Sequence, residues 1–429
     1  MSTFHPLWTL AKRLLSTQSG HWLTKVNCQN LPALLASPDK LLGVARLSLF
    51  RNVLELLLAV PRPPAVAPAK TGRHAVPQIP EALARIDDPY GIIWRVNNAF
   101  RRFDAVRALR FLQGLLTAPT YLRPILIVGM PRSGTTMLFH VLRTSEAIGS
   151  RPSEGHNIWR RFHHPRKSGW SSDHVGKGQV RFGERRYVNA HFFAYAGRKR
   201  LIDKTADNIV RVPYLLDLFP DAIFVVMKRN PCDAINSYIN MWKQPGGRFR
   251  SYYVPTDLDI PGYRQKRMWC STLIRGWREF ASKPVHEIAF EQWRQYVDAI
   301  EEARHAVPPG QWTEFFLRDL LDHPESTSDW LFKRLGIEAT PAVRVKLNEL
   351  IANPLNGLSA PAREKWRTQN PKELAELLPR IADRCRTLGC TVDANSGMFE
   401  YESIAPSLGR NGSLPSKSGE CLLSTHCRQ

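Results

Sequence analysis

The sequence predicts an α/β fold in which a central, mostly parallel sheet is flanked by helices. Residues 125–136 (ILIVGMPRSGTT) and 222–238 (AIFVVMKRNPCDAINSY) each begin with an apolar run that is typical of a buried strand. Each run ends in a short polar loop, and a segment that is compatible with a helix follows. Strand, loop and helix repeated in this order indicate a parallel sheet, because neighbouring parallel strands need a crossover connection.

The loop after the first strand has the glycine spacing of a P-loop, so we expect a P-loop-type sheet. Four residues separate Gly129 from Gly134, and the backbone N–H groups of such a loop attract anions together with the dipole of the next helix. The usual Lys-Ser/Thr ending is absent, since Thr135 and Thr136 occupy these positions. A triphosphate normally requires that lysine and Mg²⁺. The loop therefore favours a less demanding phosphate, without a metal and with Arg132 as the nearest cation.

The chain of 429 residues is strongly basic, with 60 Lys and Arg against 38 Asp and Glu and a formal net charge of +22. Such a balance indicates an anionic ligand, a membrane surface or nucleic acid. No helix-turn-helix, zinc-finger or RNP pattern occurs, so we expect no nucleic acid partner. The seven cysteines are widely spaced and odd in number, which favours a reducing, cytoplasmic compartment.

We expect three parts along the chain. Residues 1–70 are predicted as a helical, apolar and basic N-terminal extension that ends in a proline-rich linker. Within it, residues 41–60 read as an amphipathic helix that packs on the core or makes peripheral contact with a membrane. Residues 71–400 are predicted as the α/β domain, with a helix over residues 89–117 before the first strand. Residues 401–429 are rich in Ser and Gly and are expected to be disordered.

The two strand–loop–helix units together resemble those of the PAPS-dependent sulfotransferases. PRSGTT after a buried strand is similar to the loop that binds the 5′-phosphosulfate in that family. Arg229 and Ser237, eight residues apart, match the Arg and Ser that bind the 3′-phosphate. The resemblance covers roughly residues 120–390 and includes residues 361–367 (PAREKWR), where the family often carries a basic, Trp-containing loop over the cofactor.

The resemblance implies an enzyme that moves the sulfuryl group of PAPS to a hydroxyl or amine of an acceptor, with no metal. The residues that it assigns to the 5′-phosphosulfate are Arg132, Ser133, Gly134, Thr135 and Thr136, and those assigned to the 3′-phosphate are Arg229 and Ser237. The carbohydrate and protein-tyrosine branches are most similar, because Glu154 stands where they carry a catalytic base. Lys204 stands where they stabilise the bridging oxygen, and Arg132 would help to neutralise the leaving 3′,5′-ADP.

Several alternatives remain open at this stage. His156 is a second candidate for the base, because cytosolic small-molecule sulfotransferases use a histidine. Asn230 replaces the commoner Asp after the motif arginine, which removes an orienting carboxylate. The acceptor is a small molecule, a carbohydrate or a lipid-linked compound, and residues 160–200, basic and aromatic, are expected to line its cleft. The competing functions are a basic protein that binds polyanions or membrane surfaces, and a P-loop kinase, against which the missing lysine counts.

Overall fold

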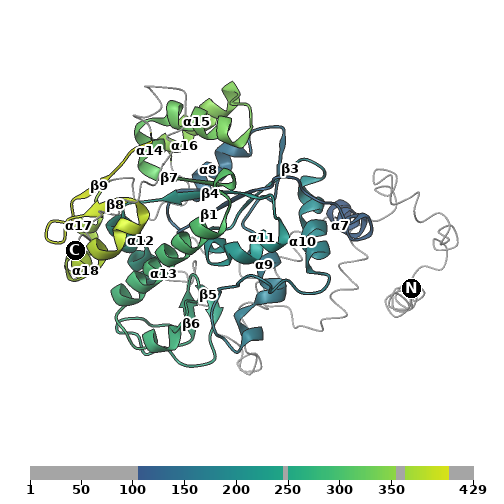
Figure 1. Ribbon diagram of the computed structural model, residues 1–429. Helices are drawn as coiled ribbons and strands as arrows, with labels where there is room; N and C mark the ends of the chain where they lie inside the picture. Colours follow the sequence, from purple (N-terminus) through teal and green to yellow (C-terminus); the bar gives the residue numbers. More distant parts are fainter. Residues whose placement is uncertain (1–104, 245–249, 354–362, 405–429) are drawn as a thin grey trace, which may run out of the picture.

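The computed structural model describes residues 105–244, 250–353 and 363–404. Their centre is a five-stranded sheet with the strand order β2-β3-β1-β4-β7, in which every neighbouring pair is parallel (Figure 1). The strands of this sheet are β1 (Ile125–Gly129), β2 (Ile148–Ser150), β3 (Arg200–Lys204), β4 (Ile223–Lys228) and β7 (Trp312–Phe316). The predicted α/β class with a central parallel sheet is therefore confirmed.

The middle strands are apolar along their whole length because both faces of the sheet are covered. All residues of β1 and β4 are buried, and the two strands pair with Ile125 opposite Ile223. Leu126 and Val128 belong to the hydrophobic core on one face, whereas Ile125 and Ile127 belong to the core on the other. A strand between two cores needs apolar residues at every position, and this accounts for the continuous runs in the sequence.

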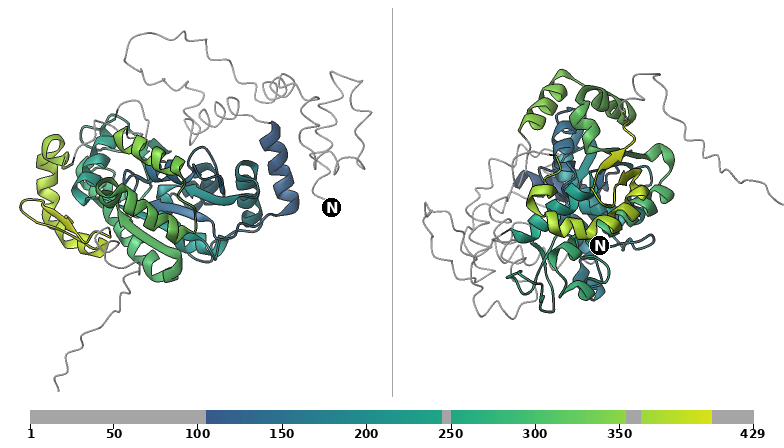
Figure 2. Two further views of the ribbon diagram at one scale, coloured as in Figure 1. Left: turned by 90° about the horizontal axis from the view of Figure 1, so that it is seen from above. Right: turned by 90° about the vertical axis from the view of Figure 1, so that its left-hand side faces the viewer.

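Helices cover the two faces in separate groups (Figures 1 and 2). One face is covered by α8 (Thr135–Leu142), α14 (Leu317–Asp322), α15 (Pro324–Leu335) and α16 (Pro341–Ala352). The other face carries α9 (His156–His163), α10 (Glu184–Ala196), α11 (Val212–Leu218), α12 (Pro231–Lys243), α13 (Val285–Ala306) and α18 (Pro371–Cys385). Helix α7 (Ala105–Thr117) packs against α10.

Smaller elements complete the described chain. They are the hairpins β5 (Arg250–Tyr253) with β6 (Met268–Cys270) and β8 (Cys390–Val392) with β9 (Phe399–Tyr401), the short helix α17 (Trp366–Gln369), and the 3-10 helices η2 (Pro165–Ser168), η3 (Ala206–Arg211), η5 (Trp277–Phe280), η6 (Pro309–Gln311) and η7 (Arg386–Leu388). No helix within the described ranges combines the length and the apolar composition that crossing a membrane requires.

Two predicted boundaries need comment. The disordered tail was predicted to start at residue 401, but the first residues of that range are ordered. Tyr401 is the last residue of β9, and Ser403 Oγ donates a hydrogen bond to Asp319. Strand β9 pairs with β8, and its Phe399 and Tyr401 pack against Phe316 of β7, contacts that composition alone does not reveal. The N-terminal extension, the first part of the helix predicted over 89–117 and residues 405–429 lie outside the described residues.

Gly129 ends β1 in a conformation that a larger residue cannot adopt easily. Its φ is +134°, and a Cβ atom added there would lie 2.9 Å from the carbonyl oxygen of Met227. We expect Gly129→Ala to lower the free energy of unfolding by about 2 kcal/mol or more, since strain and a backbone clash combine. Gly178 is a matched control, because its φ is +76° but no atom lies within 4 Å of an added Cβ. The free energy of unfolding of Gly129→Ala and of Gly178→Ala is measured by urea unfolding. Equal losses of this free energy in the two variants would show that the clash with Met227 contributes nothing.

Candidate functional site

The site lies where three neighbouring parallel strands end. Strands β3, β1 and β4 are adjacent in the sheet, so their carboxyl ends meet at one edge, the usual binding edge of such sheets. The loop after β1 contains the predicted cradle, β3 ends at Lys204, and Arg229 follows β4 directly. The order of the strands thus brings together residues that are about a hundred positions apart in the sequence.

The loop of residues 129–136 turns sharply into α8. Arg132 and Gly134 have φ values of +74° and +86°, and Gly134 is the N-terminal cap of the helix. Ser133 is fully buried, and its Oγ has no hydrogen-bond partner among the described residues. A buried hydroxyl without a partner costs free energy unless a ligand satisfies it. Together with the free N–H groups of a helix start, this hydroxyl is suited to bind an anion.

The residues predicted for the two ends of the cofactor are in direct contact. Arg132 Nε donates to Ser237 Oγ at 3.4 Å, and an Nη atom of Arg229 donates to the Arg132 carbonyl oxygen at 2.9 Å. Burial lowers the pKa of Arg229, and the neighbouring Asp233 opposes this effect. The guanidinium nonetheless stays charged, because the pKa of arginine is far above neutrality. Two half-buried cations and a hydroxyl therefore form one continuous surface beside the cradle.

Two residues of this surface were not assigned from the sequence. Burial and the charges of Arg229 and Arg132 lower the pKa of Lys365. This lysine therefore belongs to the same group of cations. Asp233 accepts the backbone N–H of Glu364 at 3.1 Å and so attaches the segment with Lys365 to α12. Burial raises the pKa of Asp233, whereas Arg229 acts in the opposite direction. The sequence contained a signal for both, because the segment 361–367 was marked as basic and Asp233 stands one helical turn after Arg229.

The replacement of Asp by Asn230 has a structural explanation. The Asn230 side chain accepts the N–H of Cys232 at 2.9 Å and caps the start of α12. The carboxylate beside Arg229 is supplied by Asp233 instead, whose charge acts on that arginine. An Asn at this position therefore leaves Arg229 with an acidic neighbour.

Lys204 connects the cradle to the predicted base. Its Nζ donates to Thr136 Oγ1 at 2.9 Å and also to Glu154 Oε1. The loop that carries Glu154 is fixed at the end of β3 because Gly155 N–H donates to Thr205 Oγ1 at 2.8 Å. Trp159 Nε1 donates to Asp203 at 3.1 Å just beyond. The end of β3 thus sets the position of Glu154 relative to the cradle.

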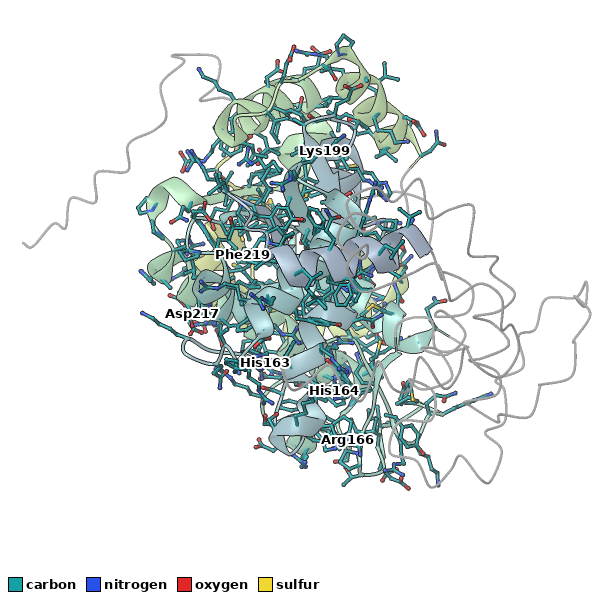
Figure 3. The ribbon with its side chains drawn as sticks, turned by 90° about the vertical axis from the view of Figure 1, so that its right-hand side faces the viewer. His163, His164, Arg166, Lys199, Asp217 and Phe219 are labelled. Carbon is teal, nitrogen blue, oxygen red and sulfur yellow. The ribbon has the colours of Figure 1, made fainter. Side chains whose placement is uncertain are left out.

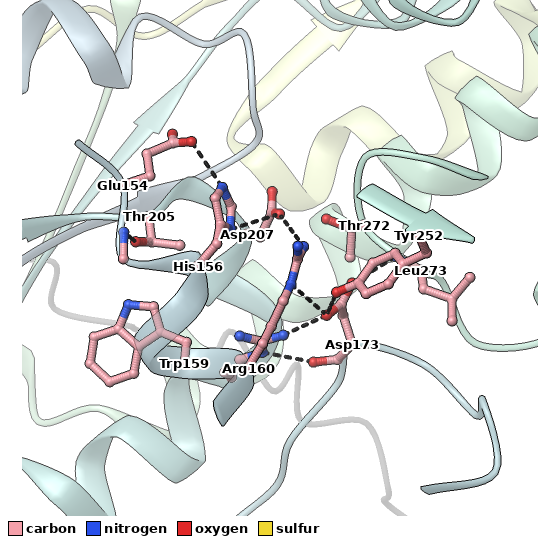
Figure 4. Close-up of polar contacts among 12 residues, drawn as sticks. Glu154, His156, Trp159, Arg160, Asp173, Thr205, Asp207, Tyr252, Thr272 and Leu273 are labelled. Carbon is pink, nitrogen blue, oxygen red and sulfur yellow. Dashed lines mark hydrogen bonds and ion pairs between the residues drawn. The ribbon is translucent and has the colours of Figure 1, made fainter. Parts of the chain in front are cut away.

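His156 lies between two carboxylates (Figure 4). Its Nε2 is 2.9 Å from Glu154 Oε2, and its Nδ1 is 3.8 Å from Asp207 Oδ2. Burial would raise the pKa of Glu154, but the hydrogen bond and charge of His156 and the charge of Lys204 outweigh it and hold this pKa well below its usual range. Glu154 is therefore a carboxylate at neutral pH, held by two donors.

Alternating charges continue behind His156 into the core. Arg160 lies 3.7 Å from Asp207 and 3.8 Å from Asp173, and its guanidinium is 4.3 Å from the centre of the Tyr252 ring (Figure 4). Asp173 is fully buried and also pairs with Arg211 at 2.5 Å. Burial would raise the pKa of Asp173, but the charges of Arg160 and Arg211 lower it. A buried carboxylate with several partners is a rigid support for the groups in front of it.

All the predicted site residues thus lie on connected elements at one edge of the sheet. Glu154, Lys204 and Thr136 are linked by hydrogen bonds, as are Arg132, Ser237 and Arg229. The network of Arg160, Asp173 and Asp207 was not expected, because its members come from separate segments whose proximity no local pattern shows. In the described ranges, no group of three or more His, Cys, Asp or Glu side chains is placed to hold a metal ion.

Fold and site together define an α/β protein of the P-loop type with an anion cradle, a second cationic subsite and a carboxylate beside a lysine. Residues 124–293 match the model of the sulfotransferase family, and this segment contains β1, β3, β4 and every predicted site residue. Over the segment that carries the site, the chain is therefore similar to the sulfotransferase family.

Three matched proteins illustrate the similarity. Nodulation protein NoeE of Sinorhizobium fredii is 29% identical over 135 residues, which cover 28% of this chain and 32% of NoeE, so the match spans about a third of that relative. The sulfotransferase STF9 of Mycobacterium avium aligns over 70% of this chain and 85% of its own, with 15% identity and a TM-score of 0.45. The mouse sulfotransferase SULT7A1, solved with PAP, aligns over 66% and 92%, with 12% identity and a TM-score of 0.37.

The depressed pKa of Glu154 depends on His156. We expect His156→Gln to move the Glu154 titration upward toward its ordinary value, because the imidazole that lowers this pKa is lost while Lys204 remains. The stability that this pairing contributes in the wild type is present above the ordinary pKa of about 4.3 and is lost as the pH falls through the lower folded value. Carbon NMR titration of protein with labelled glutamate side chains measures the shift.

The matched control is His305→Gln, which changes an exposed histidine on α13. It is expected to leave the Glu154 titration in place. A Glu154 resonance that titrates identically in the wild type and in His156→Gln would show that Lys204 alone holds the carboxylate.

Proposed function

We propose that this protein transfers the sulfuryl group of PAPS to a hydroxyl or amine of an acceptor molecule. The observation that carries the proposal is the contact between the two anion subsites, in which Arg229 binds the Arg132 carbonyl and Arg132 binds Ser237. PAPS carries anionic groups at the 3′ and 5′ positions of one ribose, and adjoining subsites suit such a molecule. The family match over residues 124–293 supports the same reaction.

The residues present fit this donor. The unpartnered, buried Ser133 Oγ and the start of α8 would hold the 5′-phosphosulfate together with Arg132, Thr135 and Thr136. Arg229 and Ser237 would hold the 3′-phosphate, with Lys365 as a further cation. PAPS, when bound, supplies the sulfuryl group and a leaving phosphate that needs neither the Walker lysine nor Mg²⁺.

Glu154 is the better candidate for the base. Both ring nitrogens of His156 face carboxylates, and its Nδ1 is buried, so neither is placed to meet an acceptor. The Glu154 side chain is 37% exposed beside the cradle. It removes the proton of the acceptor hydroxyl, whose oxygen forms the new bond to sulfur as the bond from sulfur to the phosphate oxygen breaks. His156 then acts as a positioning residue that orients the carboxylate.

Lys204 links this proton transfer to the leaving group. In the structure its Nζ binds both Glu154 and Thr136, and Thr136 belongs to the cradle. We infer that Lys204 turns to the negative charge that develops on the leaving phosphate oxygen, where Arg132 also acts. Its withdrawal from Glu154 removes a cationic donor and makes the carboxylate more basic at the step that needs a base.

The acceptor is proposed as a small molecule of the carbohydrate or glycolipid class. Residues 160–200 follow the base in the chain and supply basic and aromatic side chains, which suit polar rings and anionic substituents. The cytoplasm is the proposed location. In the described ranges Cys232, Cys270, Cys385 and Cys390 are free and buried, as expected for a reducing compartment.

Arg229→Ala tests the donor. We expect calorimetric titration to show micromolar binding of 3′,5′-ADP to the wild type and about 10- to 100-fold weaker binding to the variant, since a charge-assisted hydrogen bond contributes about 1.5–3 kcal/mol. Arg186→Ala, which removes an exposed arginine of α10, is the control and should bind as the wild type does. Preference for ATP with Mg²⁺ over 3′,5′-ADP would overturn the proposal and favour a kinase.

Glu154→Gln tests the base. We expect turnover of ³⁵S from labelled PAPS to hydroxyl and amine acceptors to fall about 10²- to 10⁴-fold, the usual contribution of general base catalysis. Binding of 3′,5′-ADP should change little, because Glu154 lies outside the residues assigned to the cofactor. His156→Gln should retain more activity than Glu154→Gln. The reverse order would identify His156 as the base.

A further inference from the structure

A second concentration of positive charge lies in a cavity of about 580 Å³ along strand β2. Four cations line it and come from three parts of the chain: Arg110 on α7, Arg143 at the end of α8, and Arg198 and Lys199 between α10 and β3. Gln113, Ser150 and Tyr195 add hydrogen-bonding groups to the wall. No aspartate or glutamate is among the lining residues.

The charges of this cavity, which we call the β2 pocket, are not neutralised by the described part of the chain. None of Arg110, Arg143, Arg198 and Lys199 forms an ion pair with a described carboxylate. Other surface arginines are paired, for example Arg344 with Asp329 and Arg380 with Glu287. Four like charges around one cavity repel each other, and an anion between them relieves this repulsion.

The β2 pocket is separate from the site described above. Helix α8 begins at the cradle and ends before Arg143, and β3 begins just after Lys199 and ends at Lys204. Arg143 and Lys199 therefore lie at the edge of the sheet where strands begin, whereas the cradle lies where they end. In Figure 3, Lys199 lies far from His163, the last residue of α9, and from His164.

Strand β2 forms one wall of the pocket. It is the outermost strand of the described sheet and pairs only with β3, so its outer edge has backbone groups that no other strand uses. Ile148, Gly149 and Ser150 make up the whole strand, and all three line the pocket. The Ile148 N–H already donates to the Ser145 carbonyl oxygen at 3.1 Å, so the donors to the oxygens of sulfate and phosphate are chiefly the arginine and lysine side chains.

We propose that the β2 pocket is a binding site for a compact cluster of sulfate or phosphate groups. This inference does not depend on the proposed reaction. Such a ligand has two sources, a separate polyanion or an anionic stretch of the acceptor. Ser150 lies four residues before Glu154 in the chain, so the pocket reaches toward the loop of the base. A long acceptor bound along β2 would extend to that loop, whereas a separate anion would occupy the pocket alone.

Calorimetric titration with sucrose octasulfate tests the site. We expect the double variant Arg198→Glu/Lys199→Glu to bind this probe at least tenfold more weakly than the wild type, and the wild-type affinity to fall with added NaCl. Both side chains are exposed and unpaired with described carboxylates, so the fold should tolerate the change. Arg186→Glu reverses an exposed charge of α10 outside the pocket and is expected to weaken binding less than twofold.

Arg229→Ala separates this site from the cradle. Unchanged octasulfate binding in Arg229→Ala supports the β2 pocket whether or not 3′,5′-ADP binds to the protein. Loss of octasulfate binding in Arg229→Ala, or equal losses in Arg186→Glu and the double variant, would overturn the inference, because the probe would then follow the cradle or the general surface charge.

Sulfated oligosaccharides distinguish the two sources of the ligand. An acceptor stretch predicts that a sulfated octasaccharide binds at least tenfold more tightly than a sulfated disaccharide and slows hydrogen exchange of residues 153–156. A separate polyanion predicts similar affinities and unchanged exchange in that loop. Either pattern of saccharide binding supports the β2 pocket if the double variant Arg198→Glu/Lys199→Glu abolishes that binding. If neither saccharide binds to the wild type, the inference is overturned.

Discussion

The contact of Lys204 with both Thr136 and Glu154 is the interaction on which the site depends. It joins the cradle after β1 to the loop after β2 through the last residue of the strand that lies between them. Lys204 is 7% exposed, so its charge acts in a medium where electrostatic interactions are stronger than in water. A cation in this place holds the carboxylate of Glu154 and at the same time faces the anion subsite.

Burial of so much charge requires a support, and the alternating network provides it. From Glu154 the polar contacts run through His156, Asp207 and Arg160 to Asp173, which is fully buried. Each charge has an opposite neighbour, and Leu273 N–H and the Tyr252 hydroxyl bind Asp173 in addition. Removing one member would leave its neighbours buried without compensation, a larger cost than the contact itself contributes. The network therefore fixes geometry more than it adds stability.

The sequence predicted the fold where local patterns carry the information. The apolar runs of β1 and β4 and the glycines of the first loop were sufficient for the sheet class and for the cradle. Strands β2, β3 and β7 were not predicted, because they are short or mixed in polarity, as in Arg200–Lys204. Lys204 was assigned through resemblance, and its place at the end of a strand came only from the structure.

Pairings between distant segments were outside the reach of the sequence. Asp173, Asp207 and Tyr252 surround Arg160, yet nothing near any of them in the chain indicates the others. The same holds for Lys365, which lies near Arg132 across more than 200 positions. Such contacts are set by the order of strands in the sheet and by the packing of helices over it. Neither the strand order nor the helix packing can be deduced from a single sequence.

The net charge of +22 indicated an anionic ligand without placing it. Charges on a protein surface are screened over about 10 Å at 0.1 M salt, so only cations that the fold gathers can act together. The fold gathers cations both where the strands of the sheet end and where they begin. At the edge where the strands end, Arg132, Arg229 and Lys365 have Asp233 among them, which suits a defined ligand with separate anionic groups. At the opposite edge, the β2 pocket has no carboxylate in its wall. The two sets of cations therefore differ in what they can select. We therefore expect the first set to discriminate by shape and spacing and the second to respond mainly to the density of negative charge.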